Sequence, residues 1–67
     1  LRGSHDVAVS TLRGASEKAP QAAVIRYHLA MAQAKAGRLQ EAKASYQAGM
    51  TIDSTLPEAR SAAALVQ

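Results

Sequence analysis

Two helical segments joined by one glycine occupy the stretch from Ile25 to Asp53, IRYHLAMAQAKAGRLQEAKASYQAGMTID. In the first segment, apolar and small residues recur at steps of four, three and four, at Ile25, Leu29, Ala32 and Ala36. The second segment has a similar spacing, at Leu39, Ala42, Tyr46, Gly49 and Met50. Steps of three and four place side chains on one face of a helix. The pattern therefore predicts two amphipathic helices, each burying one face against the other.

The break between the two helices lies at Gly37. Glycine takes the left-handed backbone conformation that ends many helices, and Lys35 places a cation in the last turn, where the helix dipole is negative. Two helices joined by so short a turn lie antiparallel. The backbones can approach closely because many facing residues are small, with Tyr46 filling the remaining space; the small residues are Ala30, Ala32, Ala42 and Gly49.

The same pattern occurs about 34 residues earlier in the chain, which is the length of one helix pair. Gly37 then falls on Gly3, Ala42 on Ala8, Tyr46 on Leu12, Gly49 on Ala15 and Ser54 on Pro20. Self-similarity at this period indicates a repeat protein built from stacked helix pairs. Residues 1–22 would be the second helix of a preceding repeat, 23–56 a complete repeat, and 57–67 a terminal or capping helix.

These residues resemble the tetratricopeptide repeat (TPR), a helix-turn-helix unit of about 34 residues with small residues at fixed packing positions. Pro20 falls on the boundary between two units, and Arg26 departs from the family, which often has a large aromatic residue there. The resemblance implies an all-α array of about four antiparallel helices with right-handed superhelical stacking. It assigns structural packing roles to Leu29, Ala30, Gly37, Ala42, Tyr46 and Gly49.

A narrower likeness covers residues 24–38, VIRYHLAMAQAKAGR. This segment is similar to the last repeat of bacterial exported lipoproteins associated with the exosortase (PEP-CTERM) system and exopolysaccharide production. The likeness implies the C-terminal part of a longer bacterial TPR protein with an envelope, exopolysaccharide or protein-sorting role. The compartment would then be the periplasm or the envelope, and otherwise the cytoplasm.

The composition fits a small helical unit and argues against several other classes of protein. The chain has 67 residues, two tyrosines, no other aromatic residue and no cysteine, so its core must consist of small and aliphatic side chains without disulfides. No apolar run approaches the roughly 18 residues that a membrane span requires, and no secretory signal is visible. The net charge of +3 is spread along the chain, which favours a solvated surface over a nucleic-acid site.

The first helix is expected to start at Ser4 as its N-cap, with Asp6 in its first turn. It is expected to end near Lys18, because Pro20 disfavours helical geometry in the residue before it. The segment Arg2-Gly3-Ser4-His5 also resembles the remnant of an expression tag. Because its glycine fits the repeat register, we favour native sequence, and both origins stay open.

The other helices follow from the same signals. The second is expected from residue 20 or 21 to 36, and the third over 39–52. Thr55 and Glu58 predict a capping box at the start of the last helix. No segment alternates with period two, so the sequence predicts no strand.

The sequence offers no constellation for catalysis or metal binding. His5 and His28 lie on different expected helices without ligand partners at helical spacing, and a zinc site needs three or four ligands. The five carboxylates form no pattern of an acid–base pair, and neither a nucleophile elbow nor a phosphate-binding loop is present. The sequence therefore predicts a protein that is not an enzyme, with no metal site and no cofactor.

Stacked helix pairs curve, and the resemblance implies that the first helix of each pair lines the inner surface. The residues expected in this groove are Val24, Tyr27, His28, Met31 and Lys35. Tyr27 offers a flat apolar face with a hydroxyl, Met31 an adaptable apolar surface, and Lys35 a cation for an acidic group. The alternative is that Tyr27 and Met31 pack on a neighbouring helix of this chain or of a second copy. The carboxylate clamp of some family members is not expected, because Tyr27 and Met31 stand where it has Lys and Asn.

The sequence thus predicts a non-catalytic protein–protein interaction scaffold with a concave helical groove for a protein or peptide partner. Two alternatives stay open. One is a structural self-association module, including a homodimer, because a short array has open ends. The other is a small helix-turn-helix nucleic-acid binder, whose recognition helix would expose only Gln40, Lys43 and Gln47. We otherwise expect neither a nucleic-acid partner nor membrane insertion of this segment.

Overall fold

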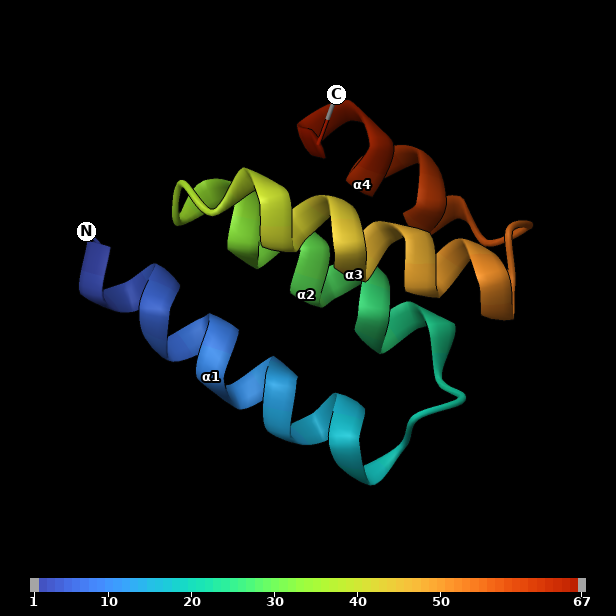
Figure 1. Ribbon diagram of the computed structural model, residues 1–67, viewed down its shortest axis with the longest axis horizontal. Helices are drawn as coiled ribbons and strands as arrows, with labels where there is room; N and C mark the ends of the chain where they lie inside the picture. The colour runs from blue at the N-terminus through green and yellow to red at the C-terminus, as the bar shows by residue number, and fades with distance from the viewer. Residues whose placement is uncertain (1, 67) are drawn as a thin grey trace.

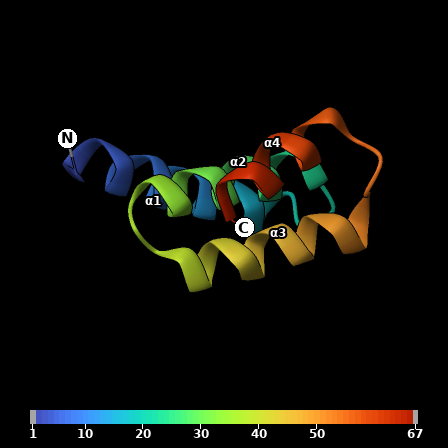
Figure 2. The ribbon, with the colours of Figure 1, turned by 90° about the horizontal axis from the view of Figure 1, so that it is seen from above.

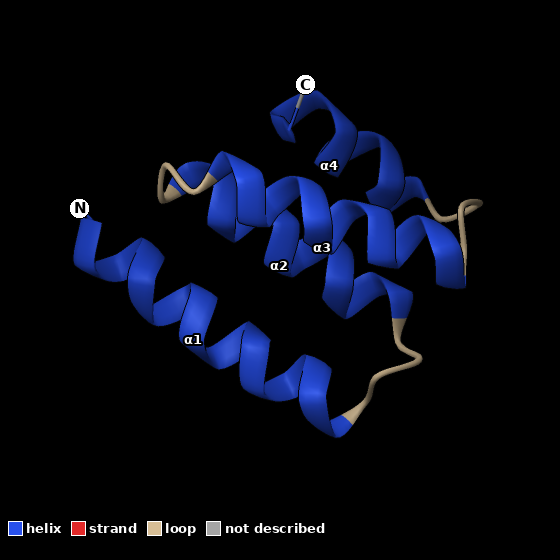
Figure 3. Cartoon of the chain, viewed as in Figure 1, coloured by secondary structure: helices blue, strands red, loops and turns tan. Residues whose placement is uncertain are grey.

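The chain folds into four helices in a computed structural model that describes the backbone of residues 2–66 and the side chains of residues 4–66. They are α1 (Arg2–Lys18), α2 (Ala23–Lys35), α3 (Leu39–Ile52) and α4 (Pro57–Val66), arranged as shown in Figure 1. The described residues contain no strand (Figure 3). The predicted all-α fold of antiparallel helix pairs is confirmed.

The turn between α2 and α3 forms because Gly37 has a φ of +82°. The N–H of Arg38 donates to the carbonyl of Gln33 at 2.8 Å, and the N–H of Gly37 donates to the carbonyl of Ala34 at 3.1 Å. These two bonds form the Schellman motif, which satisfies carbonyls at the end of a helix. The left-handed glycine thus reverses the chain, and α3 folds back along α2.

The start of α2 differs from the prediction. The helix begins at Ala23 rather than at residue 20 or 21. The N–H of Ala22 donates to the carbonyl of Ala19 at 3.0 Å, so Pro20 lies inside a turn, and Ala22 is extended with φ −87° and ψ 96°. A proline fixes φ near −65°, a value that suits the second position of such a turn as well as the first turn of a helix.

The predicted N-cap of the first helix is wrong. The helix α1 already includes Arg2, so Ser4 lies within it and Asp6 lies beyond its first turn. Gly3 is therefore helical, whereas its register counterpart Gly37 has a positive φ. Gly3 lies within the single helix α1, whereas Gly37 lies in the turn between α2 and α3, where the chain reverses.

The predicted capping box of the last helix is also wrong. The carboxylate Oδ1 of Asp53 accepts hydrogen bonds from the N–H of Thr55 at 2.9 Å and from its hydroxyl at 2.5 Å. The Thr55 hydroxyl therefore binds backwards along the chain, in the kind of turn that Asp side chains form with residues two further on. The N–H of Ala59 instead donates to the carbonyl of Leu56, at 3.0 Å.

The core lies around α2, which packs against each of the other three helices in the described part of the chain. Most of its members are alanines around the single large side chain of Tyr27; the cluster comprises Ala23, Tyr27, Ala30, Ala42, Ala59, Ala62 and Val66. Two residues that the sequence pattern assigned to the buried face of α3 are largely outside this core. Leu39 is 49% and Met50 is 36% exposed, because α3 turns Ala42, Ser45 and Gly49 inward instead.

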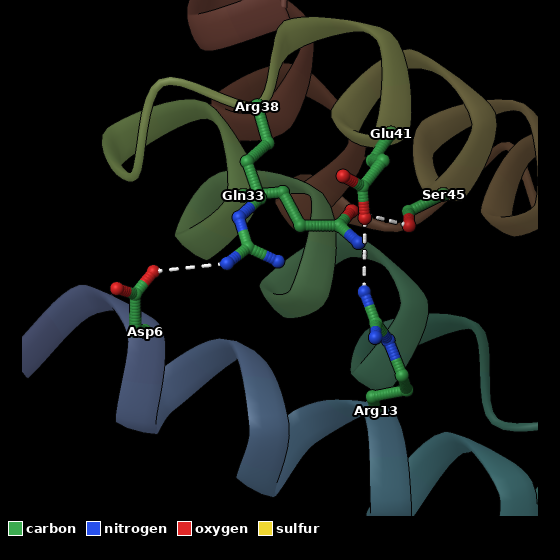
Figure 4. A network of polar contacts seen from close by, with 6 residues as sticks. All are labelled: Asp6, Arg13, Gln33, Arg38, Glu41 and Ser45. Carbon is green, nitrogen blue, oxygen red and sulfur yellow. Dashed lines mark hydrogen bonds and ion pairs between the residues drawn. The ribbon is translucent and has the colours of Figure 1, made fainter.

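Polar contacts attach α1 to the rest of the molecule (Figure 4). Arg13 binds Glu41 at 2.9 Å and Arg38 binds Asp6 at 3.2 Å, so two ion pairs of opposite polarity cross from α1 to α3 and the turn before it. Their side chains are 40–55% exposed. Exposed pairs contribute only about 0–1 kcal/mol each, so they orient α1 more than they stabilise it.

Seen from above, α3 lies on one side of the molecule, while α1, α2 and α4 overlap in a band on the other (Figure 2). The extents of 31 × 27 × 18 Å describe a flattened molecule. In Figure 1, α1 lies at the opposite edge from α4, and α2 and α3 lie between them. A groove opens along α2, beside α1.

Candidate interaction groove

A strip of side chains along α2 remains outside the core. Val24, His28, Met31 and Lys35 step by four, three and four, so they lie above one another on the helix surface. His28 and Lys35 are exposed, and Val24 and Met31 are half-buried. All four belong to the set that the sequence placed in the groove.

Tyr27 does not belong to this strip, and its predicted place in an exposed groove is wrong. Its side chain is 0% exposed, and its hydroxyl donates to the carbonyl of Asp53 at 2.5 Å. The ring lies 6.1 Å from that of Tyr46 and packs over Gly49. Tyr27 follows Ala23 by four residues and precedes Ala30 by three, so it shares their buried face. Tyr27 therefore follows the alternative expectation, in which its side chain packs on a neighbouring helix of the same chain.

A hollow of about 300 Å³ lies between α1 and α2. It is lined by His5 and Ala8 from α1 and by His28, Met31, Ala32 and Lys35 from α2. We call this hollow the α1–α2 groove. Three predicted residues, His28, Met31 and Lys35, meet in it. Val24 lies on the same strip but does not line the hollow.

Met31 has two roles in this arrangement. It packs against the core cluster and also lines the α1–α2 groove. A flexible thioether side chain can cover the core and still adapt to a ligand. The sequence left two roles open for Met31, contact with a ligand in the groove and packing on a neighbouring helix. Its position in the structure is compatible with both.

The contribution of α1 to the groove was not predicted from the sequence. His5 had no predicted role, Ala8 was named only as the register counterpart of Ala42, and Ala32 was expected in the seam between α2 and α3. One signal could have pointed to α1. In the repeat register, Ala8 matches Ala42, a residue of the surface on which another helix packs.

The groove combines an apolar floor with basic edges. Ala8, Ala32 and Met31 supply the apolar surface, while His5, His28 and Lys35 carry nitrogen atoms that can donate hydrogen bonds or bear positive charge. No carboxylate lines it. The nearest acidic residue in sequence, Asp6, is already bound to Arg38. This chemistry suits an apolar side chain next to a carboxylate.

The residues predicted to serve packing occupy several environments. Leu29 is 4% exposed, Ala30 and Ala42 are 0% exposed, and Gly49 is buried beneath Tyr27. Tyr46 is half-buried. Gly37 is exposed in the turn, where its positive φ rather than its burial sets its role.

The two shifted pKa values lie outside the groove. Burial, with a smaller effect from the Asp53 carboxylate, raises the pKa of the Tyr27 hydroxyl above its ordinary value. The hydrogen bonds from Thr55 hold the pKa of the Asp53 carboxyl below its ordinary value. Both groups stabilise the end of α3 and the loop that follows it, and neither faces the α1–α2 groove.

The described residues contain no cluster of side chains that could coordinate a metal ion. His5 and His28 line the same hollow, but no group of three or more His, Cys, Asp or Glu side chains comes together in residues 2–66. A second hollow, of about 490 Å³, lies over Ser54 to Pro57 with Ala59 and Arg60. It contains none of the predicted groove residues. No helix in the described chain has the length and apolar character needed to cross a membrane.

Antiparallel helix pairs, a glycine turn and a recurring set of small core residues define a helical-repeat protein. A comparison with family models matches residues 1–66 to the tetratricopeptide repeat. The chain belongs to the tetratricopeptide repeat family. No curated protein and no solved structure matches it. Repeats of this family generally bind proteins or peptides and are typically non-catalytic.

Proposed function

We propose that this chain is a non-catalytic interaction module that holds a short amphipathic helix of a protein partner in the α1–α2 groove. The observation that carries the proposal is the meeting of His28, Met31 and Lys35 with His5 and Ala8 around one hollow. Three of these residues come from the strip that the sequence assigned to the groove. The family supports the general role, because its repeats bind proteins or peptides.

The groove chemistry defines the partner helix. Ala8, Ala32 and Met31 would receive one or two apolar side chains at helical spacing, as in other complexes in which a helix lies in a groove. His5, His28 and Lys35 would receive a carboxylate at its edge. Because Lys35 is exposed to solvent, its charge would increase specificity and association rate more than affinity, and binding would weaken with added salt.

From the narrower likeness of residues 24–38, we also propose that the parent protein is located at the bacterial envelope. Its role there would be in exopolysaccharide production or protein sorting. Only that likeness supports this part. Fractionation of the native bacterium with an antibody to the chain would find the parent protein in the envelope fraction, and recovery from the cytoplasm alone would reject the location.

A peptide selection tests the groove. A displayed library of random peptides of about 16 residues, long enough for four helical turns, is selected on the wild-type chain. The selected peptides are then measured against Ala32→Glu, which fills the groove floor, and against Ala44→Glu, which makes the same change on the exposed surface of α3. Circular dichroism on both variants verifies that the helices are retained.

We expect the selected peptides to bind wild type and Ala44→Glu alike and to lose at least about tenfold in affinity for Ala32→Glu, equivalent to about 1.4 kcal/mol. They should be rich in Asp or Glu beside Leu, Ile or Phe. Peptides that bind Ala32→Glu as tightly as wild type, or a library that yields no specific binder, would reject the groove as the interaction surface.

A further inference from the structure

Two methionines are the most readily oxidised side chains of this chain. The sequence contains no cysteine and no tryptophan, and its methionines are Met31 on α2 and Met50 on α3. Oxidation turns the flexible apolar thioether of methionine into a polar sulfoxide, and a sulfoxide reductase reverses the change. The consequence of oxidation depends on what each side chain contacts, so the surroundings of the two residues decide which of them responds.

Met31 lies at the boundary between the core and solvent. It is half-buried and packs against the core cluster, and it also lines the α1–α2 groove. Most members of that cluster are alanines, so the long side chain of Met31 supplies apolar cover that the alanines lack. The hollow beside Met31, of about 300 Å³, gives a small oxidant room to approach the side chain.

Met50 provides the contrast within the same molecule. It is 36% exposed on α3, and it belongs neither to the core cluster nor to the lining of the two hollows found among the described residues. A polar group gained at an exposed position away from the core changes stability little. Met50 therefore reports the effect of the same chemical change outside the core and the groove.

Two basic side chains flank Met31 along the helix. His28 precedes it by three residues and Lys35 follows it by four, so both are its neighbours on the surface of α2. Both are exposed and line the same groove, where the described residues place no carboxylate. A thioether sulfur accepts hydrogen bonds only weakly, whereas a sulfoxide oxygen is polar. The ammonium of Lys35 and the ring N–H of His28 are therefore donors for a sulfoxide on Met31 but not for the thioether.

We propose that Met31 is a redox-responsive site whose oxidant is a peroxide. The sulfur of Met31 takes one oxygen atom from hydrogen peroxide, so the O–O bond breaks and an S–O bond forms. The sulfur loses two electrons, the peroxide gains them, and the second oxygen leaves with both protons as water. The sulfoxide disfavours the apolar contact with the core and turns to Lys35 and His28. Oxidation thus moves this side chain from the core to the groove.

A second effect of oxidation, on partner binding, rests on the proposed function. The apolar floor of the α1–α2 groove consists of Ala8, Ala32 and Met31. The sulfoxide makes part of this floor polar and engages Lys35, the cation that would receive a carboxylate of the partner. Oxidation therefore weakens both the helix packing and the binding of an amphipathic helix, and reduction restores both.

Variants with one methionine separate the two sites. Met50→Leu keeps only Met31, and Met31→Leu keeps only Met50, each with little change in side-chain volume. Both are treated with hydrogen peroxide, and the uptake of one oxygen atom is located by mass spectrometry in the tryptic peptides 27–35 and 44–60. Thermal unfolding is followed by circular dichroism before oxidation, after it, and after reduction with a methionine sulfoxide reductase and dithiothreitol.

Oxidation of Met31 in Met50→Leu should lower the Tm by at least about 4 °C, and reduction should restore it. Oxidation of Met50 in Met31→Leu should shift the Tm by less than about 2 °C. An unchanged Tm after complete oxidation of Met31, or an equal fall after oxidation of Met50, would overturn the proposal. Failure of Met31 to react at a peroxide concentration that fully oxidises Met50 would also overturn it.

The contact between the sulfoxide and Lys35 is tested in the Met50→Leu background. Adding Lys35→Leu should enlarge the fall in Tm on oxidation, because one donor for the sulfoxide oxygen is then missing. Lys43→Leu makes the same change on the exposed surface of α3 and should leave that fall as it is. Equal falls in the two backgrounds would overturn the role of Lys35.

Peptide binding is measured separately from stability. Peptides selected on the wild type should lose at least about tenfold in affinity for oxidised Met50→Leu and regain it after reduction. Unchanged affinity would overturn the effect of Met31 on the groove. If the selection yields no binder, the proposed function fails, whereas the change in Tm still decides whether Met31 responds to peroxide. The two failures are therefore distinguishable.

Discussion

Tyr27 fills the space that Gly49 leaves open by having no side chain. The Tyr27 ring atoms lie 2.6–3.0 Å from the position of a Cβ on Gly49, and the ring is fully buried. A buried ring has no free volume to move into. Close packing of α2 on α3 therefore depends on this pair, in which the largest core side chain meets the smallest residue.

Two glycine substitutions separate packing from helix propensity. Gly49→Ala gains about 1 kcal/mol of helix propensity but meets Tyr27, and overpacking typically costs about 1–3 kcal/mol. Gly14→Ala in α1 has the same gain and meets no atom within 4 Å. By thermal or urea unfolding, we expect Gly14→Ala to be more stable than wild type and Gly49→Ala to be less stable than Gly14→Ala by about 1–3 kcal/mol. Equal stability of the two variants would show that the Tyr27 ring can move away from a methyl group at residue 49 without a cost in free energy.

The Tyr27 hydroxyl predicts a stability change at high pH. Its pKa is raised above 10.0 in the folded chain by burial and by Asp53, so the unfolded chain loses this proton first. The contribution to stability is therefore present below pH 10.0 and is lost as the pH rises through the folded pKa. Urea unfolding should show the free energy of unfolding falling above that pH.

Tyr27→Phe should make this fall less steep and should cost about 1 kcal/mol at neutral pH through loss of the hydrogen bond to Asp53. Tyr46→Phe is the control, because it removes the other tyrosine hydroxyl of the chain and leaves this bond in place. A Tyr27→Phe variant with the wild-type slope above pH 10.0 would contradict the role of the buried hydroxyl.

Helical spacing in the sequence assigned Tyr27 of α2 to the groove and Ala32 to the seam with α3, and the structure reverses both assignments. His28, Met31 and Lys35 line the groove, whereas Tyr27 turns to the core. Helical spacing alone places Tyr27 on the edge between the two faces. Its direction is decided by Gly49 opposite, which lies beyond the turn, on another helix.

The two central helices share one buried polar contact. The Ser45 hydroxyl of α3 donates to the Gln33 side-chain carbonyl of α2 at 2.6 Å, and the two residues are 8% and 3% exposed (Figure 4). A buried hydrogen bond contributes modestly when both partners are present, but leaving one partner unpaired costs about 1–3 kcal/mol. The contact therefore favours one alignment of α2 on α3 over others.

A double-mutant cycle measures this contact. Ser45→Ala should cost about 1–3 kcal/mol, because Gln33 stays buried with its carbonyl unpaired. Adding Gln33→Leu, of similar size, should recover most of that loss, because no polar group is then left without a partner. Additive losses in urea unfolding would show that the two side chains do not interact.

At the element scale, the sequence predicted helix ends well where the backbone alone decides them. The third helix was predicted over 39–52, as found, and Gly37 was expected in the turn. Helix starts that depend on a side chain were wrong. The Asp53 carboxylate accepts hydrogen bonds from both the N–H and the hydroxyl of Thr55, so the N–H that a capping box would pair with Glu58 is already bound. Ser4 lies inside α1, since a serine marks a helix start only when the preceding residue is not helical.

At the scale of the whole molecule, the fold follows from the repeat register, and the groove follows from the position of α1 in it. The register correctly indicated stacked helix pairs, because small residues recur where backbones approach. The repeat register does not identify the residues of α1 that line the groove. His5 and His28 lie on different helices, and only the packing of α1 along α2 brings them to one hollow.

The central claim is that a partner helix occupies the α1–α2 groove. The most direct measurement is a titration of the ¹⁵N-labelled chain with a peptide selected on the wild type, followed by the shifts of its amide resonances. We predict that the largest shifts cluster at the groove residues, namely His5, Ala8, His28, Met31, Ala32 and Lys35. Shifts centred on the exposed face of α3, at Gln40, Lys43 and Gln47, or on the hollow beside Arg60 would contradict the claim.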